Sequence, residues 1–519
     1  MRRTHAVVAV LTPFLLTLPA CDNAGNARPA EGTLAAAPSP LLPDTLCADP
    51  STPNQLCATI PHEVMVTLGG DYHGLDPKTQ THFDAFSWQS FVALNWPADG
   101  SGNPLPGTFA DNPAAPRVWE GWTDAAVLFW GDGAAGPCLP QLRAGGGRKL
   151  LLQMAKNGQV VNPHATFDEA VGGPLLDRNL NFALFEKKVS PDEAGYIRDS
   201  SLVTVAGQQA IDTINFPAGS YASGMTGGSV GAMEVKAAWR ILQPQSGDDT
   251  TRYYHREAVI HVPAENSPTG TPFCINATVG LVGIHIIHKT GRFPAWVWST
   301  FEHVDNAPEC LGEKNCTADP KVRYSFYNPA CDTTCKLNTQ LRGNQFLQDS
   351  SFIWNKTAPY GSRYAWGGRF GSQLGRTQAL YVPTDSMNTY WRGQMGNSVW
   401  RNYRLIGSQW QAIVPGFPKS DTSSAPAILG NTTLESYIPD NSSCIGCHSF
   451  ATTADDSVKS ADFSFLLGMA GEKPSMMASP RFNRAGGSRP AAPAEYAPRQ
   501  PAAPARPAPP AAAPGTRRR

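Results

Sequence analysis

The chain carries little charge, and the charge that it has is balanced overall. Only 16% of its 519 residues are charged, with 42 basic and 42 acidic side chains. Many basic residues lie at the ends, since residues 481–519 hold eight Arg and one acid, and Arg2 and Arg3 begin the chain. The remaining 32 basic and 41 acidic residues leave the body mildly acidic. A nucleic-acid interface needs a basic face, so this distribution and the lack of DNA- or RNA-binding motifs argue against nucleic acid as a partner.

Motifs of several common enzyme classes are also missing. The sequence contains no G-x-x-x-x-G-K-[ST] phosphate loop and no H-E-x-x-H zinc motif. Each of these motifs holds a phosphate or a metal through a fixed local geometry. Their absence excludes the nucleotide hydrolases and zinc hydrolases that are built on them. No internal repeat or coiled-coil period is present either.

No apolar run beyond the first 20 residues is long enough to cross a membrane. Residues 1–20 have a basic start and an apolar stretch over 6–18, which is the layout of a secretory signal. Residues 18–21, Leu-Pro-Ala-Cys, resemble a bacterial lipobox, in which Cys21 is lipidated; simple secretion is the alternative. We expect a signal peptide over 1–20, a flexible tether over 21–43, and an exported, periplasmic protein that is anchored to a membrane through lipid.

The eleven Cys agree with an oxidising compartment. Cys21 is the lipid candidate, and Cys444 and Cys447 belong to a motif described below. The eight that are left form an even set, as expected for about four disulfides in an exported protein. Closeness in sequence suggests the pairs Cys47–Cys57, two bridges among Cys310, Cys316, Cys331 and Cys335, and Cys138–Cys274 as the remainder.

Hydrophobic periodicity predicts an α+β protein with a strand-rich domain and long loops. The clearest helix covers 79–95, where large apolar side chains fall on one face. Residues 233–241 alternate apolar and polar side chains, which is typical of a half-buried strand. Further strands are predicted at 149–154, 182–187, 252–262, 277–288, 378–382 and 403–410, and short helices at 385–396 and 432–437.

The body divides into one large domain and a short C-terminal part. We expect residues 44–430 to form the large α+β domain, with a small helical segment over 431–480 packed on it. Residues 481–519 are mainly Pro, Ala and Arg, so they bury too little apolar surface to fold and are expected to be disordered.

The short C-terminal segment contains Cys444-Ile-Gly-Cys447-His448, a C-x-x-C-H motif. This motif attaches haem c in exported proteins. The two thiols add to the two haem vinyl groups, and His448 is then placed to bind the iron as proximal ligand. The alternative is a Cys444–Cys447 disulfide beside an incidental His. Only about 30 residues separate His448 from the Pro-rich tail, too few for a complete small cytochrome domain, so we expect the haem to pack on the large domain.

The second axial ligand would decide the chemistry of the iron. Met469 follows the motif in a predicted helix, and a Met ligand raises the reduction potential and favours electron transfer. Met469 is equally compatible with a core position. A His of the large domain is the alternative, with His303 and His288 as the leading candidates and His255, His261 and His285 as the others. An open iron face would instead permit peroxide or oxygen chemistry.

The C-x-x-C-H motif resembles the c-type cytochrome family, over the motif alone. A longer resemblance, to proteobacterial cytochrome-like lipoproteins with one C-terminal haem, rests on the segments Trp298–Asn306, Asn402–Trp410 and Asn431–Tyr437. It implies one covalent haem and no particular reaction. The chain departs from the di-haem peroxidases and di-haem rubber oxygenases, which need a second C-x-x-C-H motif, because it has only one.

Three functions are compatible with this sequence. The first is electron transfer, in which a six-coordinate haem serves a redox partner protein in the periplasm or at the membrane surface. The second is a haem-dependent oxidoreductase, peroxidase- or oxygenase-like, with an exchangeable sixth site and with His303 or Glu302 as acid or base near the iron. The third is a sensor or binding module whose haem binds a gas or has a structural part.

Overall fold

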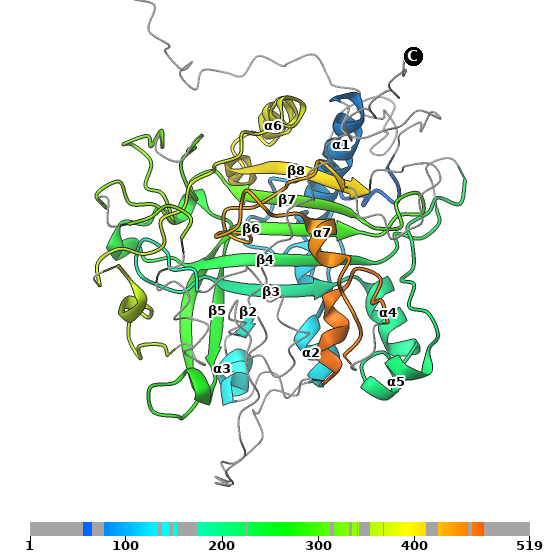
Figure 1. The fold of residues 1–519 in the computed structure, drawn as a ribbon, viewed down its shortest axis with the longest axis horizontal. Helices are drawn as coiled ribbons and strands as arrows, with labels where there is room; N and C mark the ends of the chain where they lie inside the picture. The colour runs from blue at the N-terminus through cyan, green and yellow to red at the C-terminus, as the bar shows by residue number, and fades with distance from the viewer. Residues whose placement is uncertain are drawn as a thin grey trace, which may run out of the picture. The chain divides into compact units, whose positions relative to one another are not determined.

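A computed structural model gives the fold of the chain (Figure 1). The predicted signal peptide, the tether with Cys21 and the tail over 481–519 lie outside the residues that it describes. All described residues fall within one compact unit, Met1–Met476. The structure describes residues 56–64, 77–131, 137–144, 149–152, 174–223, 227–311, 316–331, 335–339, 341, 353–366, 368–411, 424–454 and 459–471.

One sheet organises the described residues, and the α+β class is confirmed. Its strands follow the order β1-β3-β4-β6-β7-β8-β9, while β5 pairs with β6 and β2 pairs with β5. Neighbouring strands are antiparallel except for the parallel pair of β2 and β5. The strands are β1 (Thr123–Asp124), β2 (Lys149–Leu152), β3 (Leu184–Val189), β4 (Met233–Ile241), β5 (His255–Val262), β6 (Phe273–His288), β7 (Val297–His303), β8 (Tyr403–Gln411) and β9 (Ser424–Ala425).

Helices cover this sheet or link its strands. The α-helices are α1 (Pro77–Leu94), α2 (Ala125–Trp130), α3 (Leu139–Ala144), α4 (Pro191–Asp199), α5 (Val205–Ala210), α6 (Val382–Gln394) and α7 (Cys444–His448). Short 3₁₀ helices lie at Val118–Gly121, Pro244–Ser246, Thr250–Arg252, Ala264–Asn266, Ser362–Tyr364, Val399–Asn402 and Phe465–Gly471, the last of which is labelled η9. Within the described residues, no helix is both long and apolar enough to span a membrane.

Helices α1 and α6 pack on one face of the sheet, called here the helix face. Ile284 and Ile286 of β6 point to this side and join the same apolar cluster as both helices. Trp88 of α1 stacks on Trp391 of α6, with ring centroids 6.1 Å apart, and packs against Phe301 of β7 at 4.9 Å. Such aromatic contacts bury large areas of apolar surface, so this side is the main core of the protein.

The C-terminal segment covers the opposite face of the sheet, called here the C-terminal face. Side chains alternate along a strand, so Ile287 of β6 points away from the helix face. It clusters with Ile445 of α7 and with Met469 of η9. In Figure 1 the orange segment that contains α7 runs across the near side of the sheet. The C-x-x-C-H motif therefore lies directly on the sheet.

The sequence predicted most of these elements and missed some. The strand over 233–241 has the predicted bounds. The strand predicted at 378–382 is wrong, because α6 begins at Val382 with Pro383 in its first turn. The helix predicted at 432–437 is also wrong: the Asn431 side chain accepts from Thr433 N–H and hydroxyl, and such local bonds favour turns over helix. Strand β7 was not predicted, because its residues are buried on both faces and do not alternate.

The disulfides agree with the predicted pattern where the structure describes them. Cys138 is bonded to Cys274, and the cluster at 310–335 forms two bridges, Cys310–Cys316 and Cys331–Cys335. Cys57 is disulfide-bonded as well, and its predicted partner Cys47 lies outside the described residues.

Candidate functional site

Helix α7 is held in place by strand β8 of the sheet. Its first residue follows Ser443, whose hydroxyl caps the helix by accepting from Gly446 N–H at 3.1 Å. The Gln409 side chain of β8 accepts from Ile445 N–H at 2.9 Å. These two acceptors satisfy backbone donors that the first turn of a helix leaves unpaired. Ile445 is buried beneath the helix, so the thiols and the imidazole of the motif are held at fixed positions on the C-terminal face.

The two Cys of the motif remain as thiols. Cys444 and Cys447 are unpaired and partly exposed, whereas every other Cys among the described residues forms a disulfide. Burial, and next the nearby Glu435 carboxylate, raises the pKa of Cys444 well above its ordinary value; the pKa of Cys447 is raised for the same reasons. A protonated thiol is a weak nucleophile in disulfide exchange, which argues against a thioredoxin-like role.

His448 is prepared to donate one ring nitrogen. Its Nδ1 lies 2.8 Å from the carbonyl oxygen of Phe463, and since that oxygen only accepts, Nδ1 must carry the hydrogen. Its Nε2 has no hydrogen-bond partner among the described residues. Burial lowers the pKa of His448 to about 3, although the bond to Phe463 acts in the opposite direction. The side chain is therefore a neutral imidazole with its Nε2 lone pair available, which is the state that binds iron.

Aromatic rings fix the plane of this imidazole. The ring centroid of Trp298 on β7 lies 4.4 Å from that of His448, and the ring of Phe465 lies 4.8 Å away. Trp298 is itself held by a hydrogen bond from its indole N–H to the Ala295 carbonyl, at 2.8 Å. Strand β7 and the start of η9 thus orient His448, although neither ring was singled out in the sequence for this role.

A polar pair lies beside the motif on the same face. His285 Nε2 of β6 is 3.4 Å from the Glu435 carboxylate. Both groups, together with Lys236, influence the pKa of His448. Burial alone would raise the pKa of Glu435, but His285 and the Asn431 N–H lower it below its ordinary value. A charged carboxylate therefore lies close to the two thiols and the imidazole.

Among the candidates for the second axial ligand, Met469 is the one that shares an apolar cluster with the motif. It lies in η9, is buried, and belongs to the cluster of Ile445 and Trp298. The Trp130 indole donates to its backbone carbonyl at 3.1 Å. Its thioether is thus part of the packing around α7, in agreement with either a ligand or a core position.

The two leading His candidates lie elsewhere. Both nitrogens of His303 are engaged, Nε2 with the Arg252 carbonyl at 2.8 Å and Nδ1 with Asp305 N–H at 3.1 Å. His288 points to the helix face, where it stacks on Phe86 of α1 and bonds the Val230 carbonyl. Neither side chain offers a nitrogen to an iron next to α7. His285, which the sequence ranked lower, is the His of β6 that lies on the C-terminal face.

Glu302 is tied into an ion-pair network and is not an open acid or base. Its carboxylate lies 2.6 Å from Arg376 Nη2 and 3.2 Å from Arg404 Nη2, and accepts from Thr432 N–H and hydroxyl. Burial would raise its pKa, but these partners lower it to about 2. Glu302 therefore fastens the turn at 431–437, which leads into α7, to strand β7.

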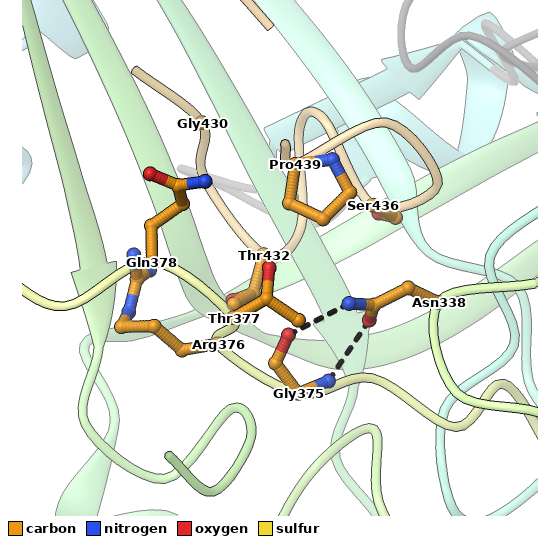
Figure 2. Close-up of a pocket in the computed structure, with 9 residues that line it drawn as sticks. All are labelled: Asn338, Gly375, Arg376, Thr377, Gln378, Gly430, Thr432, Ser436 and Pro439. Carbon is orange, nitrogen blue, oxygen red and sulfur yellow. Dashed lines mark hydrogen bonds between the residues drawn. The ribbon is translucent and has the colours of Figure 1, made fainter. Parts of the chain in front are cut away.

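Figure 2 shows a small cavity beside this network. Its volume is about 10 Å³, which is room for about one water molecule. One wall is fixed by the Asn338 side chain, which bonds both the N–H and the carbonyl of Gly375 (Figure 2). The lining residues are Asn338, Gly375, Arg376, Thr377, Gln378, Gly430, Thr432, Ser436 and Pro439. The cavity lies against the turn at 431–437 and is too small for a large ligand.

The described part of the chain contains no cluster of three or more His, Cys, Asp or Glu suited to a metal ion. No protein-family model matches the chain, and neither a curated protein nor a solved structure matches it.

The donor set at α7, two thiols and one neutral imidazole, fits a covalently attached haem. Cys444 and Cys447 would hold its vinyl carbons and His448 its iron.

Proposed function

We propose that this protein is an exported monohaem c-type cytochrome-like protein that transfers electrons. Cys444 and Cys447 attach one haem c covalently, His448 is the proximal iron ligand, and Met469 is the second axial ligand. Such a haem supplies a one-electron redox centre. The chain itself attaches, orients and shields it.

The state of His448 carries this proposal. A His that donates Nδ1–H to a carbonyl and keeps Nε2 without a partner is prepared as a metal ligand. His448 directly follows Cys447, and neither Cys447 nor Cys444 joins the disulfides formed by the other described Cys. A structural disulfide pair would explain neither the unpaired thiols nor the oriented imidazole. The packing of Met469 in the same cluster supports the choice of second ligand.

Haem attachment is tested by producing the full chain with c-type maturation machinery and measuring its intact mass and its haemochrome spectrum after denaturation. The expected result is a mass increase of one haem that survives denaturation. Cys444→Ala with Cys447→Ala should lose it. Cys331→Ala with Cys335→Ala, which also removes a closely spaced pair, should keep it. A wild-type chain without bound haem would overturn the proposal.

A haem-dependent oxidoreductase is the second candidate, because one observation favours it. His285 and Glu435 form an acid–base pair close enough to act on His448, and general acid–base catalysis needs such groups near the reacting centre. Carbon monoxide distinguishes the two functions. A reduced, low-spin spectrum that carbon monoxide does not change means that both axial sites are filled and supports electron transfer. Rapid carbon monoxide binding means an exchangeable sixth site and supports the oxidoreductase.

Export and anchoring are part of the proposal and rest on the sequence alone. We propose that residues 1–20 direct export, that Cys21 carries the lipid, and that the haem domain meets a redox partner protein in the periplasm or at the membrane surface. Labelling with a radioactive fatty acid tests the anchor. Cys21→Ser should abolish the label and release the protein from the membrane fraction.

A further inference from the structure

Two buried carboxyl groups face each other beside the C-terminal segment. Glu193 lies in the first turn of α4, and Glu234 lies on β4, on the C-terminal face of the sheet. Val189, two residues before α4, pairs with Glu234 across the sheet, and the Ser190 hydroxyl accepts from Met233 N–H at 3.0 Å. The first turn of α4 therefore begins beside Glu234, and the two carboxyl groups act on each other. Glu193 is fully buried. Ala194 and Ile197 of α4 share an apolar cluster with Ile445 of α7, so the pair lies in the part of the molecule that holds the motif.

The carboxyl groups of Glu193 and Glu234 lack the hydrogen-bond donors that would stabilise two negative charges. Both oxygens of Glu193 and the Oε1 of Glu234 are buried without a hydrogen-bond donor among the described residues. Two negative charges at such close range in a buried site are strongly unfavourable, so a pair of this kind keeps a proton between its oxygens. Burial, then the neighbouring carboxylate, raises the pKa of Glu193 well above its ordinary value, and burial raises that of Glu234.

Two structural connections join this pair to His448. The first runs through the C-terminal segment: Ser464 donates a hydrogen bond to Glu234, and its neighbour Phe463 accepts the Nδ1–H of His448. The second runs across the sheet, since Glu234 pairs with Ile287 and Ile287 pairs with Trp298, whose ring contacts His448.

We propose that Glu193 and Glu234 form a proton-binding site that takes up one proton when the attached haem is reduced and releases it on reoxidation. The inference rests on the proposed function. In the oxidised protein the pair shares one proton. An electron from a redox partner would add one negative charge near the pair, so the remaining carboxylate would take up a second proton from solvent and become a carboxylic acid. The pair titrates as one unit.

Other charged groups face the pair from each element packed against it. Lys187 of β3 and Lys236 of β4 favour its charged form. Asp462 of the C-terminal segment opposes it, and Asp462 is itself ion-paired with Lys289. The cations that act on the pair therefore come from the sheet, and the anion that acts on it comes from the C-terminal segment. These charges set the pH window in which the pair binds and releases its proton.

The test is a spectroscopic redox titration of the full-length holoprotein at a series of pH values around neutrality. In the wild-type protein the midpoint potential should fall as pH rises through the window, by up to 59 mV for each tenfold change in proton concentration. Glu193→Gln with Glu234→Gln should abolish this slope over the same window. Asp84→Asn is the matched control: Asp84 is a buried carboxyl on α1, at the helix face, with its pKa raised to about 6 by burial, and its loss should leave the slope intact.

A second measurement uses infrared difference spectra of the reduced and oxidised wild-type protein. A protonated carboxyl signal should appear on reduction and be absent from the Gln variant. If the double variant does not fold, Glu234→Gln and the wild-type spectrum decide the question. A flat potential, or a carboxyl signal that survives both substitutions, overturns the inference while a haemochrome still supports the proposed function. A chain without haem overturns both.

Discussion

The imidazole of His448 and the backbone carbonyl of Phe463 are joined by a hydrogen bond of 2.8 Å. The bond links α7 to the segment that returns across the sheet before η9. It fixes the tautomer of the imidazole and leaves Nε2 as the acceptor nitrogen. The local fold therefore sets the orientation of the His448 imidazole independently of the two thiols.

A direct consequence concerns the titration of this imidazole. An ordinary His protonates near pH 6.5, whereas burial lowers the pKa of His448 to about 3. We expect its ring to stay neutral down to about pH 4 in Cys444→Ala with Cys447→Ala, which cannot attach haem. Nitrogen NMR of labelled imidazoles measures this, and the added substitution His448→Gln assigns the signal. A midpoint near 6.5 would show that the ring is not held as described.

Met469 gives the second prediction. If its thioether binds the iron, Met469→Ala should lower the reduction potential and shift the visible spectrum, because a Met ligand raises the potential. Removing a buried Met also leaves a cavity that costs about 2–5 kcal/mol of stability. Met387→Ala is the matched control, since Met387 is also buried but lies on α6, at the helix face. An identical response of the two variants would make Met469 a core residue only.

The sequence alone named the candidate attachment residues, Cys444 and Cys447, but could not choose among the candidate distal ligands. The C-x-x-C-H motif is local, so its chemistry follows from spacing alone. The position of a His relative to the motif depends on which strands pair, and strand β7 was not predicted. One signal was available, however. His285 and His288 are three residues apart on one strand, so alternation places them on opposite faces, and only one of them can face α7. The Glu193–Glu234 pair joins residues 41 positions apart through tertiary contacts, and no local pattern indicated it.

Glu302 gives the third prediction, which separates a structural role from a catalytic one. Its carboxylate is buried between Arg376 and Arg404. Breaking a buried ion pair by removing one partner costs about 3–5 kcal/mol, because the other charge stays buried. We therefore expect Glu302→Gln to lower the free energy of unfolding by roughly that amount in urea, while the haem spectrum of the folded fraction is unchanged. Loss of a haem-dependent activity without loss of stability would instead assign Glu302 to catalysis.

The last prediction concerns acid stability and does not depend on haem. Burial lowers the pKa of His288 to about 4 in the folded protein, against about 6.5 for an unfolded chain. Between these pH values the unfolded chain binds a proton on His288 that the folded protein does not bind. The stability that depends on neutral His288 is therefore fully present above pH 6.5 and is lost as pH falls toward 4. Each pH unit in this window changes the free energy of unfolding by about 1.4 kcal/mol.

His288→Gln removes that titration and keeps a donor for the Val230 carbonyl. The destabilisation by this substitution should therefore shrink by about 2 kcal/mol between pH 7 and pH 5, as measured by urea unfolding at both values. Ile287→Val is the control, because it removes one methyl group from the adjacent residue and no titrating group. Its cost, about 1 kcal/mol, should be equal at the two pH values. A His288→Gln effect that is the same at pH 5 and pH 7 would mean that His288 is already free to protonate in the folded protein.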